Sequence, residues 1–356
     1  MKTKYLIMNP GSTSTKLALF EDETQVHEHT IRHDESEIAQ FKTIPEQKDF
    51  RKKLILDFLS ENNIELESID CFVGRGGLLH PLVGGTYNVN EKMLADLASE
   101  EFGSHASNLG ASLADELAKI NGKKAFIVDP VCVDELEDIA RISGLKEIDR
   151  VSIFHALNQK AIAYRHSEIV GKPYDKLKLI VAHLGGGISV GYHRNGRVVD
   201  VNNALNGEGP FSPERSGSLP VASLVEMCFS GEYTKKEILK KITGLGGLMS
   251  YLNTSSGIKI MEQINAGDAK TKAYYDAMIY QIIKEIGSLY FAAKGEIDGV
   301  LITGGLSYGE YLVNEIKSYI QKIVPVYVYP GEDEMTALMQ GAKRVIEGKE
   351  EAKTYT

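Results

Sequence analysis

The stretch KLKLIVAHLGGGISVGYHRNGRVVDV, residues 176–201, decides the fold. Its apolar segments at 176–182, 188–193 and 197–201 predict three strands, because each is bounded by residues that favour turns. Three consecutive glycines predict a turn between the first two strands. The pair Asn195-Gly196 predicts a tight hairpin between the last two.

The same pattern occurs at the start of the chain. Residues 3–8, 15–20 and 24–31 predict three strands, and the turn NPGSTS at 9–14 separates the first two. The two copies begin about half the chain length apart. Recurrence at that distance indicates duplicated domains, whereas a solenoid would repeat at a much shorter period.

Helical and strand patterns alternate in the rest of the chain. Helices are expected at 270–294, 308–323 and 334–347, and strands at 297–303 and 324–329. The 356 residues exceed one ordinary core. We therefore expect an α/β protein with two related domains and a boundary near residues 150–175.

Composition excludes several classes of protein. A net charge of −9 leaves no basic surplus for nonspecific nucleic-acid binding. The chain contains no apolar run of the roughly 18–20 residues that a membrane helix needs, and its start lacks the apolar region of a secretory signal. We expect a cytoplasmic protein with no membrane and no nucleic-acid partner.

The three cysteines, Cys71, Cys132 and Cys228, are too far apart to predict a disulfide framework or a metal cluster. Each has apolar neighbours in the sequence. We expect all three to be buried free thiols.

Three turns that follow apolar strands could hold phosphate. Residues 9–16 offer Gly11, hydroxyl side chains and Lys16, although a plain hairpin rich in turn residues would look the same. Residues 183–187 and the pair Gly304-Gly305 are further candidates. The P-loop pattern GxxxxGK[ST] is absent, which excludes a P-loop enzyme.

The chain resembles butyrate kinases, within the acetate kinase branch of the actin/hexokinase/Hsp70-like ATPase superfamily. The resemblance covers almost the whole chain and is specific in order and spacing. Its motifs are NPGSTSTK (9–16), VGRGG (73–77), VDPV (128–131), FHALNQ (154–159), HLGGG (183–187), DVNN (200–203), GEGPFSPERSG (207–217), TGG (303–305) and GEDEM (331–335).

This resemblance implies two duplicated actin-like ATPase (ribonuclease H-like) domains with an interdomain nucleotide cleft. It also implies that the last helix returns to the first domain, so we expect one domain of residues 1–155 plus about 333–356, and another of 156–332. The three turns become two phosphate loops and an adenosine loop. Their expected nucleotide contacts are Gly11, Ser12, Ser14, Lys16, His183, Gly185, Gly186, Gly187, Gly304 and Gly305.

The implied reaction is reversible transfer of phosphate from ATP to a carboxylate, which gives ADP and an acyl phosphate. A carboxylate is ionised at neutral pH and needs no general base. It needs cancellation of charge repulsion and in-line positioning. The planar forks of Arg75 and Arg215 suit that task, and the resemblance assigns both to the transferred phosphoryl group. The glycines beside Arg75 favour this role over that of a surface arginine.

The resemblance assigns His155 to the transferring phosphoryl oxygens, although a histidine at a helix start could equally be structural. Asp129 follows an apolar segment and would organise Mg²⁺ and the reacting groups. Asn9 and Glu334 are the further magnesium candidates. The neighbouring acids Glu332 and Asp333 remain alternatives, and an acidic cluster could also merely favour a helix N-terminus.

The chain departs from related kinases at three places. Ser256-Gly257-Ile258 stands where butyrate kinases usually carry Asp-x-Arg, which puts an adenosine contact in doubt. Gln159 and Gly74 stand where acetate kinases carry histidines. These differences favour a butyrate-type enzyme.

The preferred acid is expected to be butyrate, but one methylene in an apolar pocket is worth only about 1–3 kcal/mol. Isobutyrate, isovalerate, acetate and propionate stay open as alternatives. Rival interpretations are a kinase of a different acid or polyol on the same scaffold, an actin- or Hsp70-like ATP-driven binding protein, and a catalytically degenerate relative. The expected partners are the carboxylate or acyl phosphate and a second copy of the chain, as a homodimer or larger homo-oligomer.

Overall fold

Both predicted strand triplets form in the computed structural model, which describes residues 2–356. The first is β1 (Lys4–Pro10), β2 (Ser14–Glu21) and β3 (Thr24–Arg32), and the second is β7 (Lys178–Leu184), β8 (Ile188–Arg194) and β9 (Arg197–Val201). Neighbours within each triplet pair antiparallel. Asn195 and Gly196 have φ of 55° and 72°, as a two-residue hairpin turn of this type requires.

Two parallel strands extend each triplet in the same way. They are β4 (Cys71–Arg75) and β6 (Lys124–Val128) in the first sheet, and β10 (Gly299–Gly304) and β11 (Val326–Pro330) in the second. The order β6-β4-β1-β2-β3 therefore matches β11-β10-β7-β8-β9. The first sheet also carries β5 (Thr86–Asn88) and β12 (Lys353–Thr354) at its edge. The predicted duplicated α/β architecture is confirmed.

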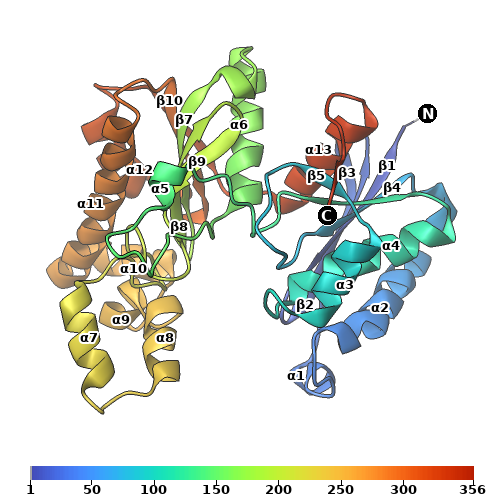
Figure 1. Cartoon of the computed structure of the whole chain (residues 1–356), viewed down its shortest axis with the longest axis horizontal. Coiled ribbons are helices and arrows are strands. Elements are labelled where there is room, and N and C mark those ends of the chain that lie inside the picture. Colours follow the sequence, from blue (N-terminus) through green and yellow to red (C-terminus); the bar gives the residue numbers. More distant parts are fainter. Residues whose placement is uncertain (1) are drawn as a thin grey trace. The chain divides into compact units, whose positions relative to one another are not determined.

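The chain divides into unit 1, residues 1–133 with 333–356, and unit 2, residues 134–332. In unit 1, α2 (Lys48–Glu61) and α4 (Leu109–Ile120) pack on one face of the sheet with Leu6 and Met8. The alternate residues Tyr5 and Ile7 face the other side, where α13 (Glu334–Ile346) covers β1, β4 and β6 (Figure 1).

Unit 2 is layered in the same manner (Figure 1). The helices α11 (Ala269–Ala292) and α12 (Glu310–Ile320) share a core with Ile180 and Ala182 of β7. On the opposite face, α6 (Ala156–Val170) packs with Leu179 and Val181. Four helices connect β9 to α11: α7 (Val221–Phe229), α8 (Lys235–Thr243), α9 (Gly247–Leu252) and α10 (Gly257–Asn265).

The shorter helices lie in the connections. They are α1 (Glu35–Ile38), α3 (Glu91–Ser99) and α5 (Asp138–Arg141), with the 3-10 helices η1 (Pro45–Gln47), η2 (Leu66–Ser68), η3 (Ala106–Asn108), η4 (Tyr174–Lys176) and η5 (Gly305–Tyr308). The helix predicted at 308–323 forms as α12 from Glu310, after η5. None of the helices described between residues 2 and 356 is both long and apolar enough to cross a membrane.

The first unit boundary lies at 133/134, whereas the sequence placed it at 155/156. Residues 134–155 belong to unit 2 because Glu135 ties them to it. The Glu135 carboxylate accepts hydrogen bonds from Lys160 on α6, at 3.1 and 3.2 Å, and from the backbone N–H of Val198 on β9, at 2.7 Å. Residues 333–356 belong to unit 1, where the sequence also put them.

The prediction of three buried thiols is correct for one cysteine. Cys71 is buried, Cys132 is half-buried and Cys228 is exposed. Cys228 lies on α7, an apolar helix that buries none of its residues in this chain. Apolar neighbours in sequence therefore did not place this thiol in a core.

Candidate active site

Three predicted site residues of unit 1 lie where its parallel strands end. Asn9 is near the end of β1, Arg75 ends β4, and Asp129 directly follows β6. Glu334 begins α13. Because the carboxyl ends of parallel strands meet at one edge of a sheet, the fold brings these groups to the same place, the usual ligand-binding edge of an open α/β sheet.

Glu334 joins two of these groups. Its Oε2 accepts a hydrogen bond from Asn9 Nδ2 at 2.7 Å, and its Oε1 forms an ion pair with Arg75. The two other acids of the cluster are engaged elsewhere. Asp333 caps α13 by accepting from Thr336 N at 2.9 Å, and Glu332 lies in unit 2. Of the three acids, Glu334 is the one in contact with other predicted site residues of unit 1.

Asp129 is held in an unusual backbone conformation. Its φ is +38°, a region that side chains other than glycine rarely adopt. The side chain is buried, and its Oδ1 accepts a hydrogen bond from Gly85 N at 2.7 Å. Such strained positions cluster at functional sites, which supports a role for Asp129.

The glycines beside Arg75 have a packing reason. A Cβ on Gly74 would lie 2.0 Å from the carbonyl oxygen of Gly110 on α4, and one on Gly76 would lie 2.5 Å from Cβ of Pro130. Both glycines therefore allow β4 to pass close to its neighbours. Sequence analysis interpreted the glycines beside Arg75 as a sign of function. Close packing explains these glycines without a ligand.

The β1–β2 turn closes on itself at Gly11, whose N–H donates to Ser14 O at 2.7 Å. Beneath it lies Arg51 of α2, which is fully buried and was not predicted. Arg51 Nη1 donates to Gly11 O at 2.9 Å, to Ser14 O at 3.0 Å and to Thr15 Oγ1 at 3.0 Å. Burial lowers the pKa of Arg51 to about 10. Lys16 forms an ion pair with Glu28 at 2.8 Å.

Two predicted histidines of unit 2 stack on each other. The rings of His155, at the start of α6, and His183, near the end of β7, have centroids 4.1 Å apart and an angle of 24° between their planes. His183 Nε2 lies 3.3 Å from Glu332 Oε2. The Nδ1 of His183 is fully buried and has no hydrogen-bond partner within residues 2–356.

The glycine-rich turn at 183–187 is covered by the segment that carries Arg215. A Cβ on Gly187 would lie 2.0 Å from Arg215 Nη1. Arg215 Nη1 donates to Ala204 O at 2.6 Å, whereas its buried Nε has no partner in the described part of the chain. Burial lowers the pKa of Arg215, and the charge of Glu214 opposes that shift.

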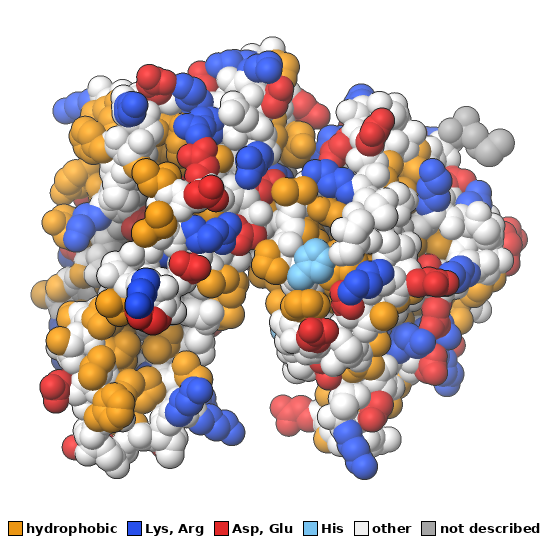
Figure 2. Space-filling model, in the orientation of Figure 1, with side chains coloured by type: hydrophobic (Ala, Val, Ile, Leu, Met, Phe, Trp, Pro, Cys, Tyr) orange, Lys and Arg blue, Asp and Glu red, His pale blue; other side chains and the backbone are white. Residues whose placement is uncertain are grey.

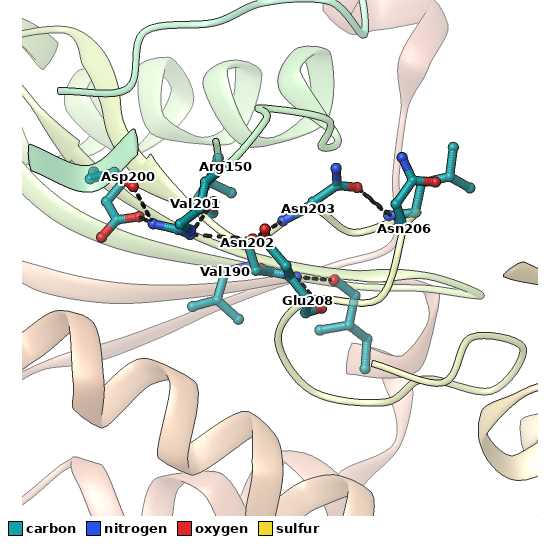
Figure 3. Close-up of polar contacts among 11 residues, drawn as sticks. Arg150, Val190, Asp200, Val201, Asn202, Asn203, Asn206 and Glu208 are labelled. Atoms are coloured by element: carbon teal, nitrogen blue, oxygen red, sulfur yellow. Dashed lines mark hydrogen bonds and ion pairs between the residues drawn. The ribbon is translucent and has the colours of Figure 1, made fainter. Parts of the chain in front are cut away.

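A polar cluster fixes the loop that holds Arg215 (Figure 3). Arg150 forms ion pairs with Asp200 at 2.8 Å and with Glu208 at 3.4 Å, and Glu208 also accepts from the backbone N–H of Asn203 at 3.0 Å. The next residue after Asn203 is Ala204, whose carbonyl receives Arg215. Sequence reasoning noted this stretch only as a motif and missed Arg150.

The Gly304-Gly305 turn joins β10 to η5. Gly304 has φ of +92°, and a Cβ there would lie 2.4 Å from Leu184 O, so only glycine fits. Gly305 faces open space. The departure at Ser256–Ile258 lies beside this turn, since a Cβ on Gly257 would be 3.6 Å from Leu306 Cδ2. Ser256 caps α10, and Ile258 is exposed.

Each unit thus carries its own part of the predicted set. Asn9, Arg75, Asp129 and Glu334 lie in unit 1, and His155, His183 and Arg215 lie in unit 2.

Comparison with known proteins finds a matching family model and curated relatives that cover the full chain. The model described as the acetokinase family matches residues 146–354. Butyrate kinase 2 of Clostridium acetobutylicum is 52% identical over 355 residues and covers 100% of both chains. Butyrate kinase 1 of that organism is 52% identical over 352 residues and covers 99% of both.

Solved structures with low sequence identity share the fold. The acetate kinase of Porphyromonas gingivalis is 19% identical with a TM-score of 0.78, and the match covers 97% of this chain and 100% of that one. A propionate kinase from Francisella tularensis is 16% identical with a TM-score of 0.74, over 95% of this chain and 98% of that one.

Proposed function

We propose, from the premise that this chain belongs to the acetokinase family, that it transfers the γ-phosphoryl group of ATP to a short-chain carboxylate, with butyrate as the preferred acid. The reaction is ATP plus carboxylate to ADP plus acyl phosphate, and it runs in both directions. The observation that carries the proposal is the 52% identity, over the full length of both chains, to a protein named as a butyrate kinase.

The chemistry of the predicted residues supports this reaction. An ionised carboxylate is already a nucleophile, so the protein must bring two anions together and stabilise the charge that is transferred. In the proposal, Arg75 and Arg215 bind the oxygens of the carboxylate and the phosphoryl group, since guanidinium forks bind such groups bidentately. His155 donates to the phosphoryl oxygens, and Asp129 helps to organise the reacting groups.

The nucleotide would be held by the three turns. We assign its phosphates to the turns that contain Gly11, Ser12 and Ser14 with Lys16, and Gly185–Gly187 with His183. Backbone N–H groups in such turns attract anions. We assign the adenosine to the turn at Gly304-Gly305. Because ATP is a cytoplasmic substrate, we propose that the enzyme acts in the cytoplasm.

A magnesium ion fits the oxygen groups of unit 1. Within residues 2–356 no three His, Cys, Asp or Glu side chains form a metal-binding group. Mg²⁺ commonly takes one or two protein oxygens and completes its shell with substrate phosphates and water. The carboxylate of Glu334 and the amide oxygen of Asn9 suit that mode, with Asp129 directly or through water. Bound there, the ion would neutralise charge on the nucleotide phosphates.

We also propose that the chain forms a homodimer or larger homo-oligomer. Helix α7 offers a surface of the kind that stable interfaces cover, since Val221 and Phe229 are 73% and 87% exposed. Figure 2 shows hydrophobic side chains gathered at the end of unit 2 that carries this helix. Light scattering that gives the mass of one chain would contradict this part of the proposal.

Trapping with hydroxylamine tests the proposed function. The protein is incubated with ATP, Mg²⁺ and acids from acetate to isovalerate, and any acyl phosphate is converted to a coloured hydroxamate. We expect the highest yield from butyrate. A higher yield from isobutyrate, isovalerate, acetate or propionate would overturn the acid assignment. A folded protein that yields no hydroxamate from any acid would overturn the kinase assignment.

A further inference from the structure

A chain of hydrogen bonds runs through the interior of unit 2 and ends on His155. The hydroxyl of Tyr174 lies 2.8 Å from His193 Nδ1, and His193 Nε2 lies 2.9 Å from Gln159 Oε1. Gln159 Nε2 donates to Ser189 Oγ at 2.8 Å, and Ser189 Oγ lies 2.9 Å from His155 Nδ1. The side chains of this hydrogen-bonded series come from the 3-10 helix η4, the strand β8 and the start of α6.

The direction of the bonds is fixed at Gln159. Its Nε2 also lies 3.1 Å from the backbone carbonyl of Ser189, which can only accept. The amide nitrogen must therefore face Ser189, and the amide oxygen must face His193. His193 consequently carries its proton on Nε2 and accepts the Tyr174 hydroxyl proton at Nδ1. Burial, and next the charge of Lys160, hold the pKa of His193 well below its ordinary value, so the ring is neutral.

The hydrogen-bond partners of Ser189 determine which atom accepts its hydroxyl proton. Its Oγ already accepts from Gln159, and its own proton needs an acceptor because the residue is fully buried. Within residues 2–356, the other hydrogen-bond partner of this oxygen is His155 Nδ1. Ser189 therefore donates to Nδ1. A neutral His155 with an accepting Nδ1 carries its proton on Nε2.

We propose that Ser189, Gln159, His193 and Tyr174 are positioning residues that fix the tautomer and the ring orientation of His155. They hold the Nε2–H of His155 as a ready donor to the transferring phosphoryl oxygens. A donor that is fixed before the reaction needs no reorganisation when charge develops. The stack on His183 sets the plane of the ring, and the chain sets which nitrogen carries the proton. The role of His155 rests on the proposed function.

Kinetics of Ser189→Ala test the positioning role. Loss of one preorganised donor costs about 100- to 1,000-fold in kcat, so loss of its positioning should cost less, about 10- to 100-fold. We expect the KM values for ATP and butyrate to stay within about twofold, since neither ligand is bound by Ser189. Ser189→Thr keeps the hydroxyl and should recover part of kcat. The matched control is Ser167→Ala on α6, a buried serine whose hydroxyl bonds to Tyr164 O in its own helix.

Nitrogen NMR of histidine-labelled protein gives a readout that does not depend on turnover. We expect the Nε2–H tautomer for His193 and for His155 in the wild-type enzyme. A protonated Nδ1 on His193, or wild-type kcat in a folded Ser189→Ala enzyme, would overturn the positioning proposal while butyrate kinase activity stands. If the wild-type enzyme forms no hydroxamate, the proposed function fails instead. If Ser189→Ala does not fold, the wild-type tautomers decide.

Discussion

The guanidinium of Arg215 occupies the space that a side chain on Gly187 would need. A Cβ on Gly187 would lie 2.0 Å from Arg215 Nη1 and 2.6 Å from its Cζ. The glycine-rich turn and the arginine, which stand in separate motifs of the sequence, are therefore one structural feature. The requirement for glycine at 187 follows from the arginine that it accommodates.

Gly187→Ala should reduce activity far more than stability. The clash involves the far end of a flexible side chain, so Arg215 can move away at small cost in folding free energy. Moving it removes the guanidinium from the position that the proposed mechanism needs. We expect kcat to fall toward that of Arg215→Ala, which we expect to lose about 100-fold or more while nucleotide binding is largely kept.

The double variant Gly187→Ala/Arg215→Ala decides whether the two residues act together. If they do, its kcat should be no lower than that of Arg215→Ala, because the effects of two residues that act through one contact are not additive. Additive losses in kcat would mean that Gly187 acts independently, for example on the nucleotide. Gly144→Ala is the control, since a Cβ there meets no atom within 4 Å.

Arg150→Met should destabilise unit 2 and disturb Arg215 indirectly. The substitution leaves Asp200 and Glu208 without their shared cation. Burial, and next the charge of Asp200, already raise the pKa of the nearby Glu285. The ion pairs are about one quarter to one third exposed, so we expect a loss of about 1–3 kcal/mol in unfolding free energy, below the 3–5 kcal/mol of a fully buried pair.

Urea unfolding measures that loss, and Lys172→Met, which removes an exposed pair with Asp298, is its control. We also expect a lower kcat, since the 201–208 loop carries the carbonyl of Ala204 that receives Arg215. Normal stability and kcat in Arg150→Met would show that the cluster in Figure 3 does not support the loop.

Arg51→Met should weaken nucleotide binding through the β1–β2 turn. Burial is the cause of the lowered pKa of Arg51, with no carboxylate contributing. The partners of this buried cation are neutral oxygens: the carbonyls of Gly11 and Ser14, the hydroxyl of Thr15 and the amide oxygen of Gln47. Its removal frees the turn and takes a positive charge from beneath a candidate phosphate site. We expect the KM for ATP to rise severalfold, with a loss of about 1–3 kcal/mol in unfolding free energy from unpaired acceptors.

Lys52→Met is the matched control for Arg51→Met. Lys52 lies on the same helix as Arg51, and its side chain forms an ion pair with Glu116 on α4. We expect this variant to keep the wild-type KM for ATP. Equal KM values for the Arg51 and Lys52 variants would limit Arg51 to a structural role.

The sequence predicted the parts of the fold that depend on neighbouring residues. Residues 183–187 and the Asn195-Gly196 hairpin carry local signals, whereas the assignment of Arg75 and Arg215 to the site came from the resemblance to related kinases. Arg51 could not be found in this way, because its sequence context, with Lys52 and Lys53 beside it, looks like a solvated basic run. Its role depends on Gly11, which lies 40 residues away.

The departures from related kinases show a second limit of sequence reasoning. Gln159 was recognised only as a residue that differs from the histidine of acetate kinases. Its orienting role depends on Ser189, which lies 30 residues away on another element and has no local signal. Cys228 shows the converse, since α7 is apolar in sequence but finds no cover within its own chain.

The buried histidines should make the free energy of unfolding decrease as the pH falls below about 6.5. Burial lowers the pKa of His193, His166 and His33, so the folded protein keeps these rings neutral. The unfolded chain binds protons on them near pH 6.5 and therefore gains relative stability as the pH falls. Their contribution is fully present above about pH 6.5 and is lost progressively toward the lower pKa values of the folded state.

Urea unfolding between pH 5 and 8 measures this slope. Each histidine that stays neutral in the folded state contributes up to about 1.4 kcal/mol per pH unit. His193→Gln should lower stability at pH 8, because Tyr174 and Gln159 lose a partner, but it should reduce the slope by one proton. If the slope of the variant equals that of the wild type, His193 titrates in the folded state, and the neutral ring assigned to it is wrong.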